Sequence, residues 1–154
     1  MKHNLKDRVA LVTGAGQGIG AAIAKRLSKA GASIVAVDVQ SELAVSIAHE
    51  MTKAGGKALA CCANVANKLE VEEAVSAAIE EFKRIDILVN NAGIIRDGWL
   101  ANISETDWDS VLDVNLKGAF FLIQAVFPSM KENHYGKIIN ISSRAWLGNI
   151  GQAN

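Results

Sequence analysis

A glycine-rich segment near the N-terminus lies directly between an apolar run and a helical stretch. It reads Thr13-Gly-Ala-Gly-Gln-Gly-Ile-Gly20. In such a segment Gly14 permits a tight turn, Gly18 lets the backbone approach a diphosphate, and Gly20 lets helix and strand pack closely. The free N–H groups and the positive end of the following helix then hold phosphates. A plain strand-to-helix turn is the alternative, but the flanking elements favour dinucleotide binding.

An acidic residue, Asp38, ends the second apolar run, eighteen residues after Gly20. This spacing suits a hydrogen bond from the adenosine ribose hydroxyls to the carboxylate, which favours NAD over a cofactor that carries a 2′-phosphate. The alternative is a solvated turn aspartate that caps the helix near Ser41.

Five apolar runs alternate with four helical stretches, which is the pattern of a parallel sheet with crossover helices. The runs are nearly continuous, as expected for strands covered on both faces. We expect one domain over residues 1–154, an α/β doubly wound, Rossmann-like sheet with strand order 3-2-1-4-5. Ser104 is the expected N-cap of the last helix, and Pro128 is expected to kink or end it. The expected strands are Val9–Val12, Ser33–Val37, Lys57–Cys62, Asp86–Val89 and Lys137–Ile141, and the expected helices are Ile19–Ala30, Glu42–Lys53, Leu69–Phe82 and Thr106–Lys131.

The composition excludes several classes of function. Sixteen basic residues balance sixteen acidic ones, so no strong field recruits nucleic acid or anionic lipid. The apolar stretch Ala119–Phe127 is too short to span a bilayer, and no secretory signal is expected. Cys61 and Cys62 are adjacent, without metal-ligand spacing, and are expected to be reduced. We therefore expect a cytoplasmic protein with no metal, nucleic-acid or membrane partner.

Four motifs in order resemble the short-chain dehydrogenases/reductases. Three of them follow strands: the glycine segment, Asn90-Asn-Ala-Gly93, and Ser142-Ser143. The fourth is Asp113-Val-Asn-Leu116 in the last helix. The resemblance covers essentially the whole chain and is nearest to 3-oxoacyl-acyl-carrier-protein reductases. It implies hydride transfer between a nicotinamide cofactor and a ketone or secondary alcohol.

The resemblance also implies which residues contact the cofactor. Asn91 to Gly93 would lie against it, and the same segment would brace the central sheet. Asn64 stands where many relatives have an aspartate against the adenine ring, and its amide oxygen can accept the same hydrogen bond. The expected cofactor-binding residues are Gly14, Gln17, Gly18, Ile19, Asp38, Val39, Asn64, Val65, Asn91, Ala92 and Gly93.

The catalytic set of such enzymes is Asn, Ser, Tyr and Lys, the last two in a Tyr-x-x-x-Lys motif. Asn115 matches the asparagine, which in relatives interrupts the helix and holds a water of the proton path. Ser143 matches the serine by strand register, and Ser142 is the alternative. Because side chains alternate along a strand, we expect only one of the two serines to face the site.

The sequence contains no Tyr-x-x-x-Lys, since its one tyrosine, Tyr135, has no lysine four residues on. The run Gly151–Asn154 resembles the segment that precedes the catalytic tyrosine in 3-oxoacyl-acyl-carrier-protein reductases. The resemblance therefore implies an N-terminal portion, truncated after the fifth strand and inactive as it stands. The alternative is a dinucleotide-binding or redox-sensing module without catalysis. The long helix over residues 106–131 has too many apolar residues for one core-facing stripe, so a homo-oligomer is expected.

Overall fold

The computed structural model describes residues 4–152, except for the side chain of Trp146. Its centre is a parallel sheet with strand order β3-β2-β1-β4-β5, which confirms the predicted fold class and order. The observed bounds lie within one residue of those predicted. The strands are β1 (Val9–Thr13), β2 (Ser33–Asp38), β3 (Ala58–Cys62), β4 (Ile87–Asn90) and β5 (Lys137–Asn140).

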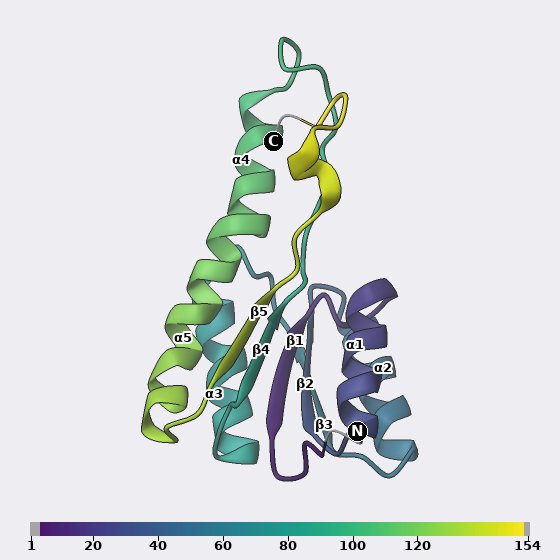
Figure 1. Ribbon diagram of the computed structural model, residues 1–154, viewed down its shortest axis with the longest axis vertical. Helices are drawn as coiled ribbons and strands as arrows, with labels where there is room; N and C mark the ends of the chain where they lie inside the picture. The colour runs from purple at the N-terminus through teal and green to yellow at the C-terminus, as the bar shows by residue number, and fades with distance from the viewer. Residues whose placement is uncertain (1–3, 153–154) are drawn as a thin grey trace.

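Helices cover the two faces of the sheet in separate pairs. Figure 1 shows α1 and α2 on one face and α3 and α5 on the other, with α4 rising beyond the carboxyl ends of the strands. Gly31 and Gly55, which follow the first two helices, adopt the left-handed conformation expected of helix stops. The helices are α1 (Gly18–Lys29), α2 (Ser41–Lys53), α3 (Lys68–Phe82), α4 (Glu105–Leu112) and α5 (Gly118–Glu132), with a π-helical turn η1 (Asp113–Lys117) and a 3₁₀ turn η2 (Arg144–Leu147).

The apolar runs of the strands supply two cores, one on each face of the sheet. Leu11 and Val35 pack with residues of α3 and α5. Ala10 and Ile34, their immediate neighbours along the strands, pack with residues of α1 and α2. Because side chains alternate along a strand, a strand covered on both faces needs apolar residues at every position. Strand β5 differs from the others, since all four of its residues are exposed.

The long helical stretch is continuous, but its α-helical hydrogen bonding changes to a π-helical turn at η1 and then returns to α-helix. Ser104 caps α4 by accepting a hydrogen bond from the backbone N–H of Asp107 at 3.0 Å, as predicted. The expectation that Pro128 ends or kinks the helix is wrong in its first part, because α5 continues to Glu132. Packing on both sides of the proline holds the helix: Val126 is buried, and the Ser129 hydroxyl accepts from the N–H of Ile85.

Within the described part of the chain, one helix is long and apolar enough, by length and composition alone, to cross a membrane. It is the combined helix Glu105–Glu132. Core helices meet the same criterion, and this one packs Leu122 and Val126 against the sheet. Four of its other apolar residues, Trp108, Leu116, Phe120 and Phe127, are exposed, which bears on assembly below.

A buried carboxylate, Asp86, ties the starts of β1 and β4 together at the amino edge of the sheet. It accepts hydrogen bonds from the Arg8 and Arg84 guanidinium groups and from the backbone N–H of Val9. Burial raises the pKa of Asp86, but these hydrogen bonds outweigh it and hold the pKa below the usual value for an aspartate. The Arg8 guanidinium also lies 3.8 Å from the ring centre of Tyr135.

Replacing Asp86 by Asn is expected to lower the free energy of unfolding by about 2–3 kcal/mol at neutral pH. The cost stays below that of a wholly buried pair because the two arginines are about a third exposed. Since the folded-state pKa is lowered, the contribution is full above about pH 4 and is lost as the pH falls through the folded-state pKa. Urea unfolding at pH 7 and at pH 3 measures both effects.

The matched control is Glu50→Gln, which removes the exposed ion pair between Glu50 and Lys25 on α2 and α1. An exposed pair contributes about 0–1 kcal/mol, so this variant should unfold nearly as the wild type does. Equal losses from Asp86→Asn and Glu50→Gln would contradict the role given to Asp86.

Candidate functional site

The glycine-rich turn between β1 and α1 has the geometry predicted for it. Gly14 and Gly18 have φ angles of +60° and +55°, in the left-handed region that favours glycine. A Cβ on Gly20 would lie 2.0 Å from the carbonyl oxygen of Gly14, so only glycine permits this packing. Gln17 makes no side-chain capping bond, and the first turn of α1 has no acidic residue. The N-terminus of α1 therefore keeps its N–H groups available for an anion.

Asp38 lies at the carboxyl end of β2, beside the glycine-rich turn. Its carboxylate accepts from the backbone N–H of Gly16 at 2.9 Å and from that of Gln40 at 3.0 Å. The side chain is 7% exposed, so it is not the solvated turn aspartate of the alternative interpretation. Its contact with α2 is through the N–H of the N-cap residue Gln40, and among the described residues it accepts no N–H from Ser41 or the first turn of the helix.

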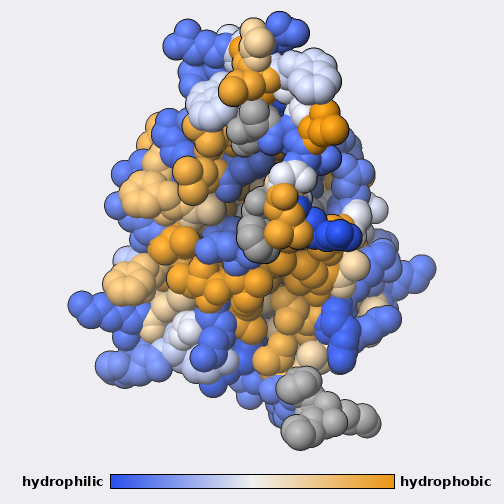
Figure 2. All heavy atoms as spheres, turned by 45° about the horizontal axis from the view of Figure 1, so that its top comes forward, coloured by the Kyte–Doolittle hydropathy of each residue, from blue (hydrophilic) through white to orange (hydrophobic). Residues whose placement is uncertain are grey.

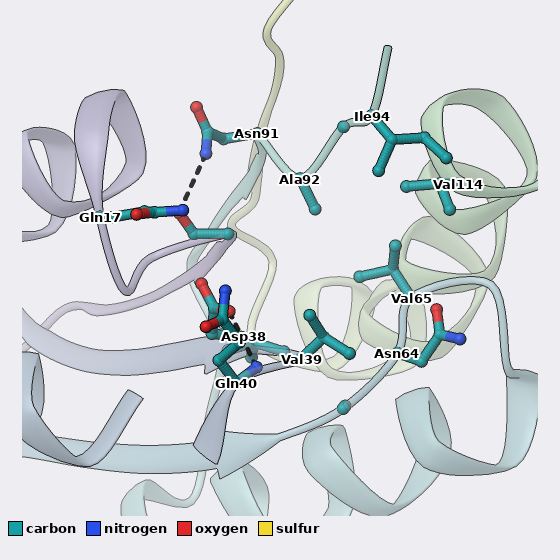
Figure 3. Close-up of a pocket in the computed structure, with 14 residues that line it drawn as sticks. Gln17, Asp38, Val39, Gln40, Asn64, Val65, Asn91, Ala92, Ile94 and Val114 are labelled. Atoms are coloured by element: carbon teal, nitrogen blue, oxygen red, sulfur yellow. Dashed lines mark hydrogen bonds between the residues drawn. The ribbon is translucent and has the colours of Figure 1, made fainter. Parts of the chain in front are cut away.

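A first cleft of about 500 Å³ runs from the glycine-rich turn past Asp38 to the ends of β3 and β4 (Figure 3). Most of the predicted cofactor-binding residues line it, and of the described residues that line it Asp38 alone is charged. Gly18 lines a shallower hollow between α1 and α2, and Ile19 lines a neighbouring cleft. The first cleft is lined by Gly14, Gln17, Val37, Asp38, Val39, Gln40, Ala63, Asn64, Val65, Asn91, Ala92, Gly93, Ile94 and Val114.

The Asn90–Gly93 segment braces the glycine-rich turn. The buried Thr13 hydroxyl accepts from the backbone N–H groups of Asn91 and Ala92, both at 3.0 Å. The Asn91 amide donates back to the carbonyl oxygens of Thr13 and Gly14 at 2.9 and 3.3 Å. The Asn91 side chain thus fixes the shape of the turn. This agrees with the bracing role expected of the segment.

Asn64 and Asn90 are placed differently. The Asn64 amide oxygen accepts from the N–H of Ala66, two residues on, and keeps a second lone pair for another donor. The Asn90 amide donates to the amide oxygen of Asn140 on β5 at 2.8 Å. The oxygen of Asn90 is buried and, among the described residues, has no hydrogen-bond partner.

A second cleft of about 640 Å³ adjoins the first and brings Asn115, Ser142 and Ser143 together. Asn115 lies in the π-helical turn η1, which confirms the expected interruption of the helix. Its amide accepts from the N–H of Ile94 at 2.8 Å and donates to the carbonyl oxygen of Ile94 at 3.0 Å. The amide oxygen and the amide nitrogen of Asn115 therefore both bond to the backbone of Ile94.

The expectation that only one of the two serines can face the site is wrong. Strand β5 ends at Asn140, so strict alternation no longer applies at Ser142 and Ser143, and both line the second cleft. The Ser143 hydroxyl accepts from the N–H of Ala145 at 3.1 Å and caps η2. In the described part of the chain, the Ser142 hydroxyl makes no hydrogen bond.

Two segments far apart in sequence close one end of the second cleft. The N–H of Gly98 donates to the carbonyl oxygen of Gly151 at 2.7 Å. The Gln152 amide donates to both carboxylate oxygens of Asp97, at 3.0 and 3.1 Å. In the run Gly151–Asn154 that resembles the segment before a catalytic tyrosine, Ala153 and Asn154 lie outside the described residues.

Several residues of the site were not predicted from the sequence. Thr13 and Gly16 shape the glycine-rich turn, and Ile94 holds Asn115. A polar residue at the end of an apolar run, as Thr13 is, is the one signal that the sequence offered. The partners of Gly16 and Ile94 lie 22 and 21 residues away, and no local pattern links them.

Comparison with known proteins gives a family and named relatives. The family described as short chain dehydrogenase matches residues 8–153. The chain is 45% identical over 148 residues to a (2S)-[(R)-hydroxy(phenyl)methyl]succinyl-CoA dehydrogenase subunit of Thauera aromatica, covering 96% of this chain and 60% of that one. It is 45% identical over 152 residues to a 3-oxoacyl-[acyl-carrier-protein] reductase of Synechocystis, covering 97% and 62%. A reductase of the same name from Thermotoga maritima is 40% identical, covering 97% and 61%. The chain thus spans about three fifths of the length of these relatives.

Proposed function

The chain belongs to the short chain dehydrogenase family, and we propose that it binds NAD(H) and serves hydride transfer between the nicotinamide and a ketone or secondary alcohol. The observation that carries this proposal is the junction of the two clefts. The segment Asn91–Ile94 lines both, with Val65 and Val114. A dinucleotide in the first cleft would therefore reach the hydroxyl and amide groups of the second. Names of relatives that refer to a succinyl-CoA and a 3-oxoacyl-[acyl-carrier-protein] support an acyl thioester substrate.

The residues of the first cleft fit such a cofactor. Gly14 and Gly20 let the turn pack closely on itself and on Asn91, the space beside Gly18 is open, and the start of α1 offers N–H groups to a diphosphate. Each oxygen of the Asp38 carboxylate accepts one backbone N–H and can accept one ribose hydroxyl as well. Val39, Val65 and Val114 give an apolar side for the adenine ring. When bound, the nicotinamide would supply or accept the hydride.

In the second cleft we propose separate roles for the chain's own polar groups. Asn115 is held by Ile94, so its π-helical turn, rather than a free side chain, would position the water of the proton path. A serine hydroxyl would donate to the carbonyl oxygen of the substrate. Strand register favours Ser143, and its hydroxyl, which caps η2 as an acceptor, keeps its own hydrogen free to donate. We therefore propose Ser143 as the donor, with Ser142 as the alternative.

NADH is expected to bind about tenfold to a hundredfold more tightly than NADPH. A 2′-phosphate about 5 Å from the Asp38 carboxylate meets a repulsion of about 1–3 kcal/mol at an effective dielectric constant near 20. Among the residues that the structure describes, no lysine or arginine lines the first cleft to compensate. Titration calorimetry with both dinucleotides measures the difference, and Asp38→Ala should narrow it.

The control for this test is Asp97→Ala, which removes an acidic residue of the second cleft only. It should leave the ratio of the two affinities unchanged. Equal affinities of the wild type for NADH and NADPH would contradict the cofactor preference. Failure to bind either dinucleotide would contradict the proposed function as a whole.

A second candidate function is a dinucleotide-binding or redox-sensing module without catalysis. It is favoured by one observation, the absence of a Tyr-x-x-x-Lys motif from these 154 residues. The two candidates differ in turnover and agree in cofactor binding. The turnover experiment in the Discussion separates them.

We propose that the long helix pairs with a second copy of the chain. Trp108, Leu116, Phe120 and Phe127 are exposed on α4, η1 and α5. Figure 2 shows apolar side chains along the left flank, where these helices lie in Figure 1. A helix that presents apolar residues both to its core and to solvent is typical of a twofold interface.

Light scattering should give at least a dimer at micromolar concentration, and the double variant Phe120→Glu, Phe127→Glu should shift it to monomer. Both side chains are 56% exposed, so the substitutions should not disturb the core. The control is Val45→Glu on α2, also at 56% exposure, which should leave the mass unchanged. A monomeric wild type would contradict the proposal.

We also propose a cytoplasmic location, supported by the two free cysteines. Cys61 is buried on β3, and Cys62, beside it, is exposed. Unpaired thiols are typical of reducing compartments. The balance of sixteen basic and sixteen acidic residues supports the absence of nucleic-acid and membrane partners.

A further inference from the structure

The carboxylate of Asp38 bonds the protein's own backbone on both sides. One oxygen accepts from the N–H of Gly16, inside the glycine-rich turn and 22 residues away in sequence. The other accepts from the N–H of Gln40, in the turn between β2 and α2, as the dashed line at Asp38 in Figure 3 shows. Asp38 therefore connects two turns that form adjacent walls of the first cleft.

Gly16 is packed closely against this carboxylate. A Cβ on Gly16 would lie 2.9 Å from the carboxylate oxygen of Asp38 and 2.5 Å from the Cβ of Leu43 on α2. The backbone of Gly16 is outside the left-handed region, so the position needs glycine for space and not for conformation. The middle of the glycine-rich turn thus lies directly on Asp38 and α2.

We infer that Asp38 is a positioning residue for the glycine-rich turn, in addition to its proposed contact with the ribose. By accepting the N–H of Gly16 it holds the turn in the shape that presents Gly18 and the start of α1 to a diphosphate. The inference rests on the proposed function, because it assigns the turn to the cofactor. It predicts that Asp38 cannot be replaced to admit NADPH without weakening the binding of every ligand that uses the turn.

A ligand that has a diphosphate but no ribose hydroxyls distinguishes the two roles of Asp38, because the two roles predict opposite changes in its affinity when Asp38 is replaced. If Asp38 acts only on the hydroxyls, removing its charge should leave such a ligand unaffected or strengthen its binding, since a repulsion between two anions is lost. If Asp38 positions the turn, the same substitution should weaken binding because the turn must then be ordered on binding. 2′,3′-Dideoxy-ADP meets both requirements.

Titration calorimetry of 2′,3′-dideoxy-ADP and NADH tests the inference on wild type, Asp38→Ala and Asp38→Asn. We expect Asp38→Ala to weaken dideoxy-ADP by about threefold to tenfold, the effect of one hydrogen bond. Asp38→Asn keeps an oxygen acceptor for the Gly16 N–H and should bind dideoxy-ADP within about twofold of wild type. Unchanged or tighter binding of dideoxy-ADP by Asp38→Ala would overturn the inference and leave the ribose contact standing.

Hydrogen exchange of the Gly16 amide provides a readout without any ligand. The amide should be protected in wild type and in Asp38→Asn, and should exchange faster in Asp38→Ala while amides of β1 and β4 keep their rates. Equal Gly16 rates in all three proteins would overturn the inference. If wild type bound neither NADH nor dideoxy-ADP, the proposed function would fail instead, and the exchange result would still report on the turn.

Discussion

A polypeptide of these 154 residues is expected to show no reductase turnover above background. Hydride delivery to a ketone produces an alkoxide, which needs a proton from a group of suitable pKa near the carbonyl. Family members use the tyrosine of Tyr-x-x-x-Lys, and the one tyrosine of this sequence is Tyr135, with Ile139 where the lysine would stand. Among the described residues that line the second cleft, no other one combines these properties.

The position of Tyr135 excludes it as a substitute donor. It lies before β5, whereas Ser142 follows β5, so seven residues of extended chain separate them, roughly 20 Å. Its ring is held at the amino edge of the sheet by the Arg8 guanidinium, 3.8 Å from the ring centre. Both serines in the cleft are hydroxyl donors whose pKa is too high to protonate an alkoxide rapidly near neutral pH.

The measurement is NADH oxidation in the presence of acetoacetyl thioester. The matched control is a chimera in which the unmatched part of the Synechocystis reductase follows Asn154. Because the chain is 45% identical to the matched part of that reductase, the two parts should pack together. We expect turnover from the chimera and none from the 154-residue polypeptide. Clear turnover by the latter would mean that another residue is the proton donor.

The fold could be predicted because each of its signals is local. Continuous apolar runs such as Val9–Val12 require cover on both faces, and the alternation with helices then fixes a parallel sheet. Gly31 follows the first helix, and a glycine there is a local signal of a helix end because it takes the left-handed conformation easily. The prediction that Pro128 ends the helix failed because tertiary contacts outweigh a local helix breaker. These contacts are the burial of Val126 and the hydrogen bond from Ile85 to Ser129.

A residue of the site could be predicted only where its position accepts a single residue type for a single physical reason. Gly20 is such a case, since its Cβ would collide with the backbone of Gly14. The acceptor roles of Thr13 toward Asn91 and of Asp38 toward Gly16 arise only when β1, β2 and β4 are brought side by side. The choice between Ser142 and Ser143 depended on where β5 ends, and boundaries are the least reliable part of a sequence-based assignment.

Replacing Ser143 by Ala is expected to lower the kcat of the chimera on the order of a hundredfold or more. Its hydroxyl lines the second cleft, and its oxygen accepts from the N–H of Ala145 while its own hydrogen stays free to be donated to a developing oxyanion. The same hydroxyl caps η2, and loss of an N-cap costs about 0.5–2 kcal/mol of stability, so the variant should also melt at a lower temperature.

Ser142→Ala is the matched variant, one residue away in the same cleft. Among the described residues the Ser142 hydroxyl makes no hydrogen bond, so its loss should leave the melting temperature of the chimera nearly unchanged. We expect Ser142→Ala to reduce kcat less than Ser143→Ala does. Stopped-flow turnover and thermal unfolding of the two variants separate a lost donor from a lost cap. If Ser142→Ala proved the more damaging to kcat, the register of β5 would be off by one and Ser142 would replace Ser143 as the donor.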